Sequence, residues 1–125
     1  MKARLIIEIA GSPKEHIEEV MKKMVDSVMH EKKVIKYNIF EAQEKNNMFF
    51  TFTEIDVDFS GIEELLGFCM DYMPSSVEIL DENNIEMKRE EFENVVNDLL
   101  AKLHQNDMTL KNLKAELMLK KNNSL

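Results

Sequence analysis

The chain has a single cysteine and no long apolar segment. Because Cys69 stands alone, the sequence excludes an intrachain disulfide, a cysteine-rich zinc site and a Cys-x-x-Cys redox pair. No apolar run approaches the ~18 residues that a membrane-spanning helix requires. The opening residues, Met-Lys-Ala-Arg-Leu-Ile-Ile-Glu, lack the apolar core and cleavage site of a signal peptide. We therefore expect a cytoplasmic protein that makes no use of a membrane.

Basic residues are scarce in the middle of the chain. The net charge is −8, and residues 41–100 carry three basic and sixteen acidic side chains, a local net charge of −13. Binding to phosphates needs a basic surface instead. The sequence also lacks the glycine-rich phosphate-binding motifs, and no aromatic residue follows Phe92 on which bases could stack. These absences argue against a nucleic-acid partner.

The apolar pattern predicts a strand, a helix, two strands, a helix, a strand and a final long helix. The predicted strands cover residues 3–9, 34–42, 48–57 and 77–80, and Ile85 and Met87 could extend the sheet. Ser-x-x-Glu capping boxes at Ser12 and Ser60 start the first two helices, with Pro13 at the first helical position. This order matches the βαββαβ arrangement of a ferredoxin-like sandwich. We expect an α+β domain over residues 1–87 and a helical, coiled-coil oligomerisation segment over residues 88–125.

The third predicted strand is apolar on both of its faces. Phe49, Phe50 and Phe52 alternate in direction along a strand, so each face of the sheet needs an apolar cover. The first two helices supply one cover. We expect the C-terminal helix or the sheet of a second subunit to supply the other, which favours a dimer.

A heptad seam follows the predicted domain. Apolar residues recur at alternating spacings of four and three, with one polar member, Asn106. The seam consists of Phe92, Val96, Leu99, Leu103, Asn106, Leu110, Leu113 and Leu117. A lone helix cannot bury such a seam. We therefore predict that these residues form an interface.

Two arrangements of the C-terminal segment stay open at this point. It can form one continuous helix, or it can break near Asn106, with Asp107 capping a second helix of an antiparallel αα-hairpin. Either form could extend or cover the sheet. For a parallel pair of continuous helices, the flanking charges are attractive between Lys102 and Asp107 and between Glu116 and Lys121 of the two copies. This favours parallel pairing weakly, because exposed ion pairs contribute little.

Few residues offer chemistry. Glu54, Asp56 and Asp58 alternate along the third predicted strand, so their carboxylates share one face and are the candidates for holding Mg²⁺ or Ca²⁺. No calcium-loop spacing accompanies them. The three histidines fall in different elements without metal-ligand spacing, and Cys69 lies on an apolar helical face, as a buried small side chain would. We assign no catalytic residue and expect no cofactor.

The sequence therefore predicts a non-enzymatic, homo-oligomeric interaction module. Its C-terminal helix would assemble subunits into a dimer or a larger oligomer, or dock another protein. The alternative is a regulatory domain that senses a small molecule. By fold analogy, ferredoxin-like dimers of the ACT kind bind effectors at an interface near the first strand-to-helix loop, which here contains Gly11 and Ser12.

Overall fold

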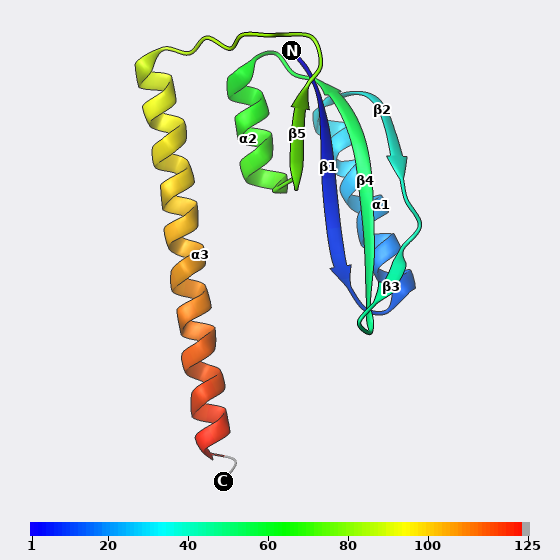
Figure 1. Ribbon diagram of the computed structural model, residues 1–125, viewed down its shortest axis with the longest axis vertical. Coiled ribbons are helices and arrows are strands. Elements are labelled where there is room, and N and C mark those ends of the chain that lie inside the picture. The colour runs from blue at the N-terminus through cyan, green and yellow to red at the C-terminus, as the bar shows by residue number, and fades with distance from the viewer. Residues whose placement is uncertain (124–125) are drawn as a thin grey trace. The chain divides into compact units, whose positions relative to one another are not determined.

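The computed structural model describes residues 1–123 and divides into two compact units (Figure 1). The first unit, Met1–Glu86, contains a five-stranded antiparallel sheet and two helices. The second begins at Met87 and contains one long helix. In chain order the elements are β1 (Lys2–Gly11), α1 (Lys14–Glu31), β2 (Lys33–Ile39), β3 (Gln43–Lys45), β4 (Met48–Asp58), α2 (Ile62–Tyr72), β5 (Ser76–Ile79) and α3 (Arg89–Asn123).

The two longest strands lie side by side in the middle of the sheet. The strand order is β2-β4-β1-β5, and the short β3 also pairs with β4. The β1–β4 ladder runs from Lys2 opposite Asp58 to Gly11 opposite Phe49 without a shift in register. Since side chains alternate between the two faces of a strand, this register fixes which side chains share a face across the central pair.

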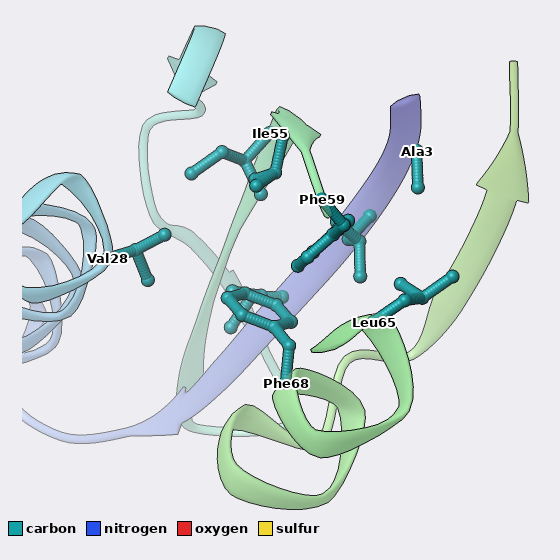
Figure 2. Close-up of a cluster of buried hydrophobic side chains, with 9 residues drawn as sticks. Ala3, Val28, Ile55, Phe59, Leu65 and Phe68 are labelled. Carbon is teal, nitrogen blue, oxygen red and sulfur yellow. The ribbon is translucent and has the colours of Figure 1, made fainter. Parts of the chain in front are cut away.

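One face of the sheet packs against α1 and α2. Ala3, Leu5 and Ile7 of β1 and Ile55 and Val57 of β4 are at most 1% exposed, and they form one cluster with helix residues. Figure 2 shows this cluster, in which the rings of Phe59 and Phe68 lie next to each other. Their ring centroids are 5.5 Å apart in an edge-to-face arrangement. Burial of the alternate strand residues and of one stripe on each helix defines the core of the first unit.

The segment predicted as one strand over residues 34–42 is divided in the structure. β2 ends at Ile39, and β3 begins at Gln43 after a short irregular stretch. In this stretch the backbone N–H of Phe40 still donates to the carbonyl of Phe52 on β4 at 2.9 Å, whereas the backbone N–H of Ala42 donates to Glu18 of α1 at 3.4 Å. The following turn uses Asn46 and Asn47, both with positive φ, a conformation that asparagine tolerates in two-residue hairpins. Residues 80–88 contain no strand, so Ile85 and Met87 do not extend the sheet.

Both predicted capping boxes are wrong in detail. α1 begins one residue later than expected, with Pro13 in the capping position, and no side chain caps either α1 or α2. Ser12 therefore lies one residue too far from the helix to cap it. At α2 the capping position is Gly61, and the backbone N–H of Ser60 donates to Glu64 at 3.1 Å. The reciprocal bond that the pattern assigns to Glu63 is thus made by Glu64.

α3 is a single helix of 35 residues, so the structure excludes the αα-hairpin. It runs through Asn106 and Asp107 without a break. Asp107 forms an i,i+4 ion pair with Lys111 at 2.9 Å and therefore supports the helix where it was expected to cap a new one. At 1.5 Å per residue, α3 is about 52 Å long. No helix among the described residues is long and apolar enough to cross a membrane.

Two buried threonines on β4 provide a test of the core. Thr51 and Thr53 point to the same face and are 1% and 0% exposed. The Thr51 hydroxyl donates to the carbonyl of Phe40 at 2.6 Å, whereas the Thr53 hydroxyl has no hydrogen-bond partner among the described residues. An unsatisfied buried hydroxyl costs about 1–3 kcal/mol, which valine avoids at the same shape. We expect Thr53→Val to raise the melting temperature by roughly 4–8 °C per kcal/mol gained.

Thr51→Val is the matched control for that variant. It makes the same chemical change on the same strand, but it removes a hydrogen bond that exists, so we expect a loss of about 1 kcal/mol. Thermal unfolding followed by circular dichroism measures both effects. A stability loss for Thr53→Val as large as that for Thr51→Val would mean that the Thr53 hydroxyl is bonded in the folded protein.

Candidate interaction surfaces

The predicted interface residues lie on a helix that buries none of its described side chains. Among the seam residues, Phe92, Leu99, Leu103, Leu110, Leu113 and Leu117 are each between 45% and 67% exposed. Because an α-helix turns 100° per residue, the alternation of four and three residues places the whole seam on one side of α3. A contiguous exposed apolar surface of this length is typical of a protein–protein contact.

Four further large, exposed apolar side chains of α3, Met108 among them, lie outside the seam. Leu100 is 56% exposed, Met118 67% and Leu119 62%. Leu100 lies beside the seam, whereas Met118 and Leu119 lie about 130° around the helix from its centre. The seam itself keeps the narrow a/d spacing of a coiled coil.

The sheet face that α1 and α2 do not cover carries an ionic cluster on one half. Arg4 of β1 is opposite Asp56 of β4, and its guanidinium donates to the two carboxylate oxygens at 2.9 and 3.1 Å. Glu54 approaches the same guanidinium at 3.4 Å, and Lys36 approaches Asp56 at 3.7 Å. The hydrogen bond with Asp56 raises the pKa of Arg4. Two parallel hydrogen bonds from one guanidinium to one carboxylate are among the strongest charged hydrogen bonds in proteins.

The three metal-ligand candidates lie on this face, and each has a cationic neighbour. Glu54 and Asp56 share Arg4, whereas Asp58 lies 3.6 Å from both the N-terminal ammonium and Lys33. Their charge is therefore balanced by groups of the chain itself. Among residues 1–123, no three Asp, Glu, His or Cys side chains are grouped so as to hold a metal ion.

The other half of the same face is aromatic. Phe40 stacks on Phe52 with ring centroids 4.2 Å apart, and Phe50 and Met48 are 44% and 43% exposed nearby along β4. The face of β4 that carries Met48, Phe50 and Phe52 is therefore not covered within the first unit, whereas Phe49 and the buried Thr51 lie on the opposite face.

The first strand-to-helix loop has a structural reason for its glycine. A Cβ atom at Gly11 would lie 2.6 Å from Cδ1 of Ile17, a residue that is 4% exposed. A larger residue here would displace the end of the buried Ile17 side chain, so glycine suits the close approach of β1 to α1. Ser12 caps no helix, and the loop shows no polar side chain that is buried without a partner.

A hollow of about 590 Å³ lies at the start of α2. It is lined by Glu63, Glu64, Glu82 and Glu86, together with Ile62 and Ile85 among others. Glu64 is engaged, because it accepts from Ser60 and lies 3.7 Å from Lys32. Acidic residues around an open hollow are also typical of a solvated surface.

Cys69 is partly buried on α2, next to the core cluster. Burial raises the pKa of its thiol, which lowers the fraction of reactive thiolate at neutral pH. We expect iodoacetamide to modify Cys69 more slowly in the folded chain than in the same chain in urea, and the difference should persist at pH 8. Mass spectrometry over time measures both rates. Equal rates in the two conditions would mean that the thiol is open and activated.

Comparisons with known proteins locate the whole chain in one family. The model of the MJ0538 family matches residues 2–124. The chain belongs to the MJ0538 family. The match includes both the residues of the sheet unit and those of α3. No curated protein and no solved structure matched the chain.

Sequence reasoning missed the residues that balance the carboxylates. Arg4 was not identified as one of these residues, although it lies in the first predicted strand and on its polar face. Its partner became visible only through the β1–β4 register, which brings residues 52 positions apart in the sequence into contact. The Phe40–Phe52 stack was also missed, because Phe40 lies in the irregular stretch after β2.

Proposed function

We propose that this member of the MJ0538 family is a non-enzymatic interaction module that assembles with itself through α3. The observation that carries the proposal is the exposed seam. A continuous helix of 35 residues buries no described side chain, and from Phe92 to Leu117 it presents a seam on one side that is apolar except at Asn106. Burying apolar surface stabilises a complex by about 25 cal/mol for each Å² removed from water, which favours a partner on this side of α3.

The first unit fits the role of a folded body that carries the helix. We propose that it is a ferredoxin-like sandwich. What supports this is the antiparallel order β2-β4-β1-β5, with α1 following β1 and α2 following β4 on one face of the sheet. The fold hosts many functions and therefore does not itself argue for an activity.

Co-purification tests self-assembly. Two copies of the full chain, one tagged and one untagged, are expressed together and captured through the tag. We expect the untagged copy to be retained in near-equal amount after washing at moderate salt. Retention of the tagged copy alone would contradict the proposal, provided that both copies are present in the lysate as soluble protein.

A further inference from the structure

We infer that the occupant of the α3 seam is the α3 of a second copy, and that the two helices run antiparallel. The inference rests on the proposed function, because it names the partner and its direction at that same surface. It is carried by the uneven distribution of charge along the helix and along the chain.

α3 has an acidic half and a basic half. Residues 89–106 carry two basic and four acidic side chains, a net charge of −2, and residues 107–123 carry four basic and two acidic, a net charge of +2. Two parallel copies would place like halves next to each other along the whole helix. Two antiparallel copies place each acidic half against a basic half, which is the complementary arrangement.

The charge of the first unit favours the same direction. Residues 1–86 carry nine basic and eighteen acidic side chains, a net charge of −9. Each such unit is joined to the N-terminal end of its own α3 by residues 87–88. A parallel pair would bring two strongly acidic units to one end. An antiparallel pair attaches them at opposite ends of the helix pair, with attachment points about 52 Å apart, which is several Debye lengths at physiological salt.

The seam also fits an antiparallel register. If residue i of one helix lies opposite residue 209 minus i of the other, every seam residue meets a seam residue. The layers are then Phe92 with Leu117, Val96 with Leu113, Leu99 with Leu110, and Leu103 with Asn106, each occurring twice. In this register Glu93 flanks Lys114 of the other copy, which adds an attractive pair on both sides.

Asn106 lies next to the two-fold axis of this register. It is three residues from the level of its own symmetry mate, a separation of about 4.5 Å along the helix axis. The two amides are therefore within reach of each other and can satisfy their hydrogen bonds. A polar residue at the centre of the seam would then fix the register, since any shift would bury each amide against apolar residues only.

The opposing consideration is the set of flanking pairs that favours parallel helices. Lys102 with Asp107 and Glu116 with Lys121 are attractive in that direction. These pairs lie at the solvent edge, where exposed ion pairs contribute little. In a parallel pair, repulsion between like-charged halves of α3 and between the two acidic units opposes these attractive pairs along the whole assembly.

A distance measurement between spin labels decides the direction. In the full chain with Cys69→Ser, a label at Asn122→Cys lies on the outer side of α3. We expect a separation between the two copies of about 55 Å for antiparallel helices, against about 25 Å for parallel helices. Pulsed electron–electron double resonance resolves the two. A distance near 25 Å would overturn the antiparallel direction and leave self-assembly intact.

A label at Ala101→Cys is the matched control. It also lies on the outer side, but close to the middle of the seam, so both directions give about 25–30 Å. A short distance at this position shows that the labelled chains associate. Loss of the dipolar signal at both positions would overturn the proposed function itself, and the inference with it.

Discussion

Leu110→Glu is expected to weaken self-association at least about 100-fold. In an assembled pair both copies lose a buried leucine side chain, worth about 1.5–3 kcal/mol each, and both introduce a carboxylate into an apolar seam. A loss of about 3 kcal/mol corresponds to a factor of roughly 100 in the dissociation constant. Glutamate is a good helix former, so α3 itself should persist. Sedimentation velocity over a concentration series measures the change.

Met108→Glu is the matched control for that prediction. Met108 and Leu110 are both 53% exposed, and both substitutions place a glutamate in the middle of α3. The two positions differ by about 200° around the helix, so Met108 points away from the seam. We expect its dissociation constant to stay within about twofold of the wild-type value. Equal weakening by both variants would show that the seam is not the contact surface.

Phe68→Ala is expected to reduce the stability of the first unit by about 3–5 kcal/mol. Phe68 is 1% exposed, and it contacts Phe59 edge-to-face and Tyr72 by stacking at 4.6 Å. Leu65 and Phe68 are the fully buried residues of α2, so the helix loses one of its two deepest contacts with the core. A unit of 86 residues has a total stability of roughly 4–13 kcal/mol. Urea unfolding followed by circular dichroism should therefore show a variant whose unfolding midpoint lies at a much lower urea concentration than that of the wild type.

Phe50→Ala makes the same change on the open face of the sheet. Because Phe50 is 44% exposed, we expect a loss of only about 1 kcal/mol. The comparison also tests whether this aromatic half is open in solution. A loss for Phe50→Ala that matches Phe68→Ala, and that grows with protein concentration, would mean that a second copy covers the face.

The order of the elements was predictable because the residue pattern that indicates each strand or helix lies within that element itself. Alternation along residues 34–39 and the 3.6-residue period after Pro13 depend on neighbours in the sequence alone, and so does the continuous heptad of α3. The αα-hairpin alternative arose from the polar run around Asn106. It was excluded because the segment contains no glycine or proline to end a helix, and because Asp107 pairs with Lys111.

The functional surfaces were harder to predict from the sequence because they depend on the register between neighbouring strands. Glu54, Asp56 and Asp58 were correctly placed on one face, since alternation needs only the strand itself. Their pairing with Arg4 needs the exact alignment of β1 with β4, which no local pattern specifies. The capping residues shifted by one position for a similar reason. A Ser-x-x-Glu pattern predicts where a helix begins to within a residue, whereas the bonds depend on the exact residue.

The measurement that tests the central claim most directly is the molar mass of the full chain by light scattering behind a sizing column. The chain has a mass of 14.6 kDa. Self-assembly through α3 predicts a mass of two or more chains for the full protein, and a single-chain mass for a truncation after Glu86. A full-length protein that stays at 14.6 kDa at high micromolar concentration would contradict the account.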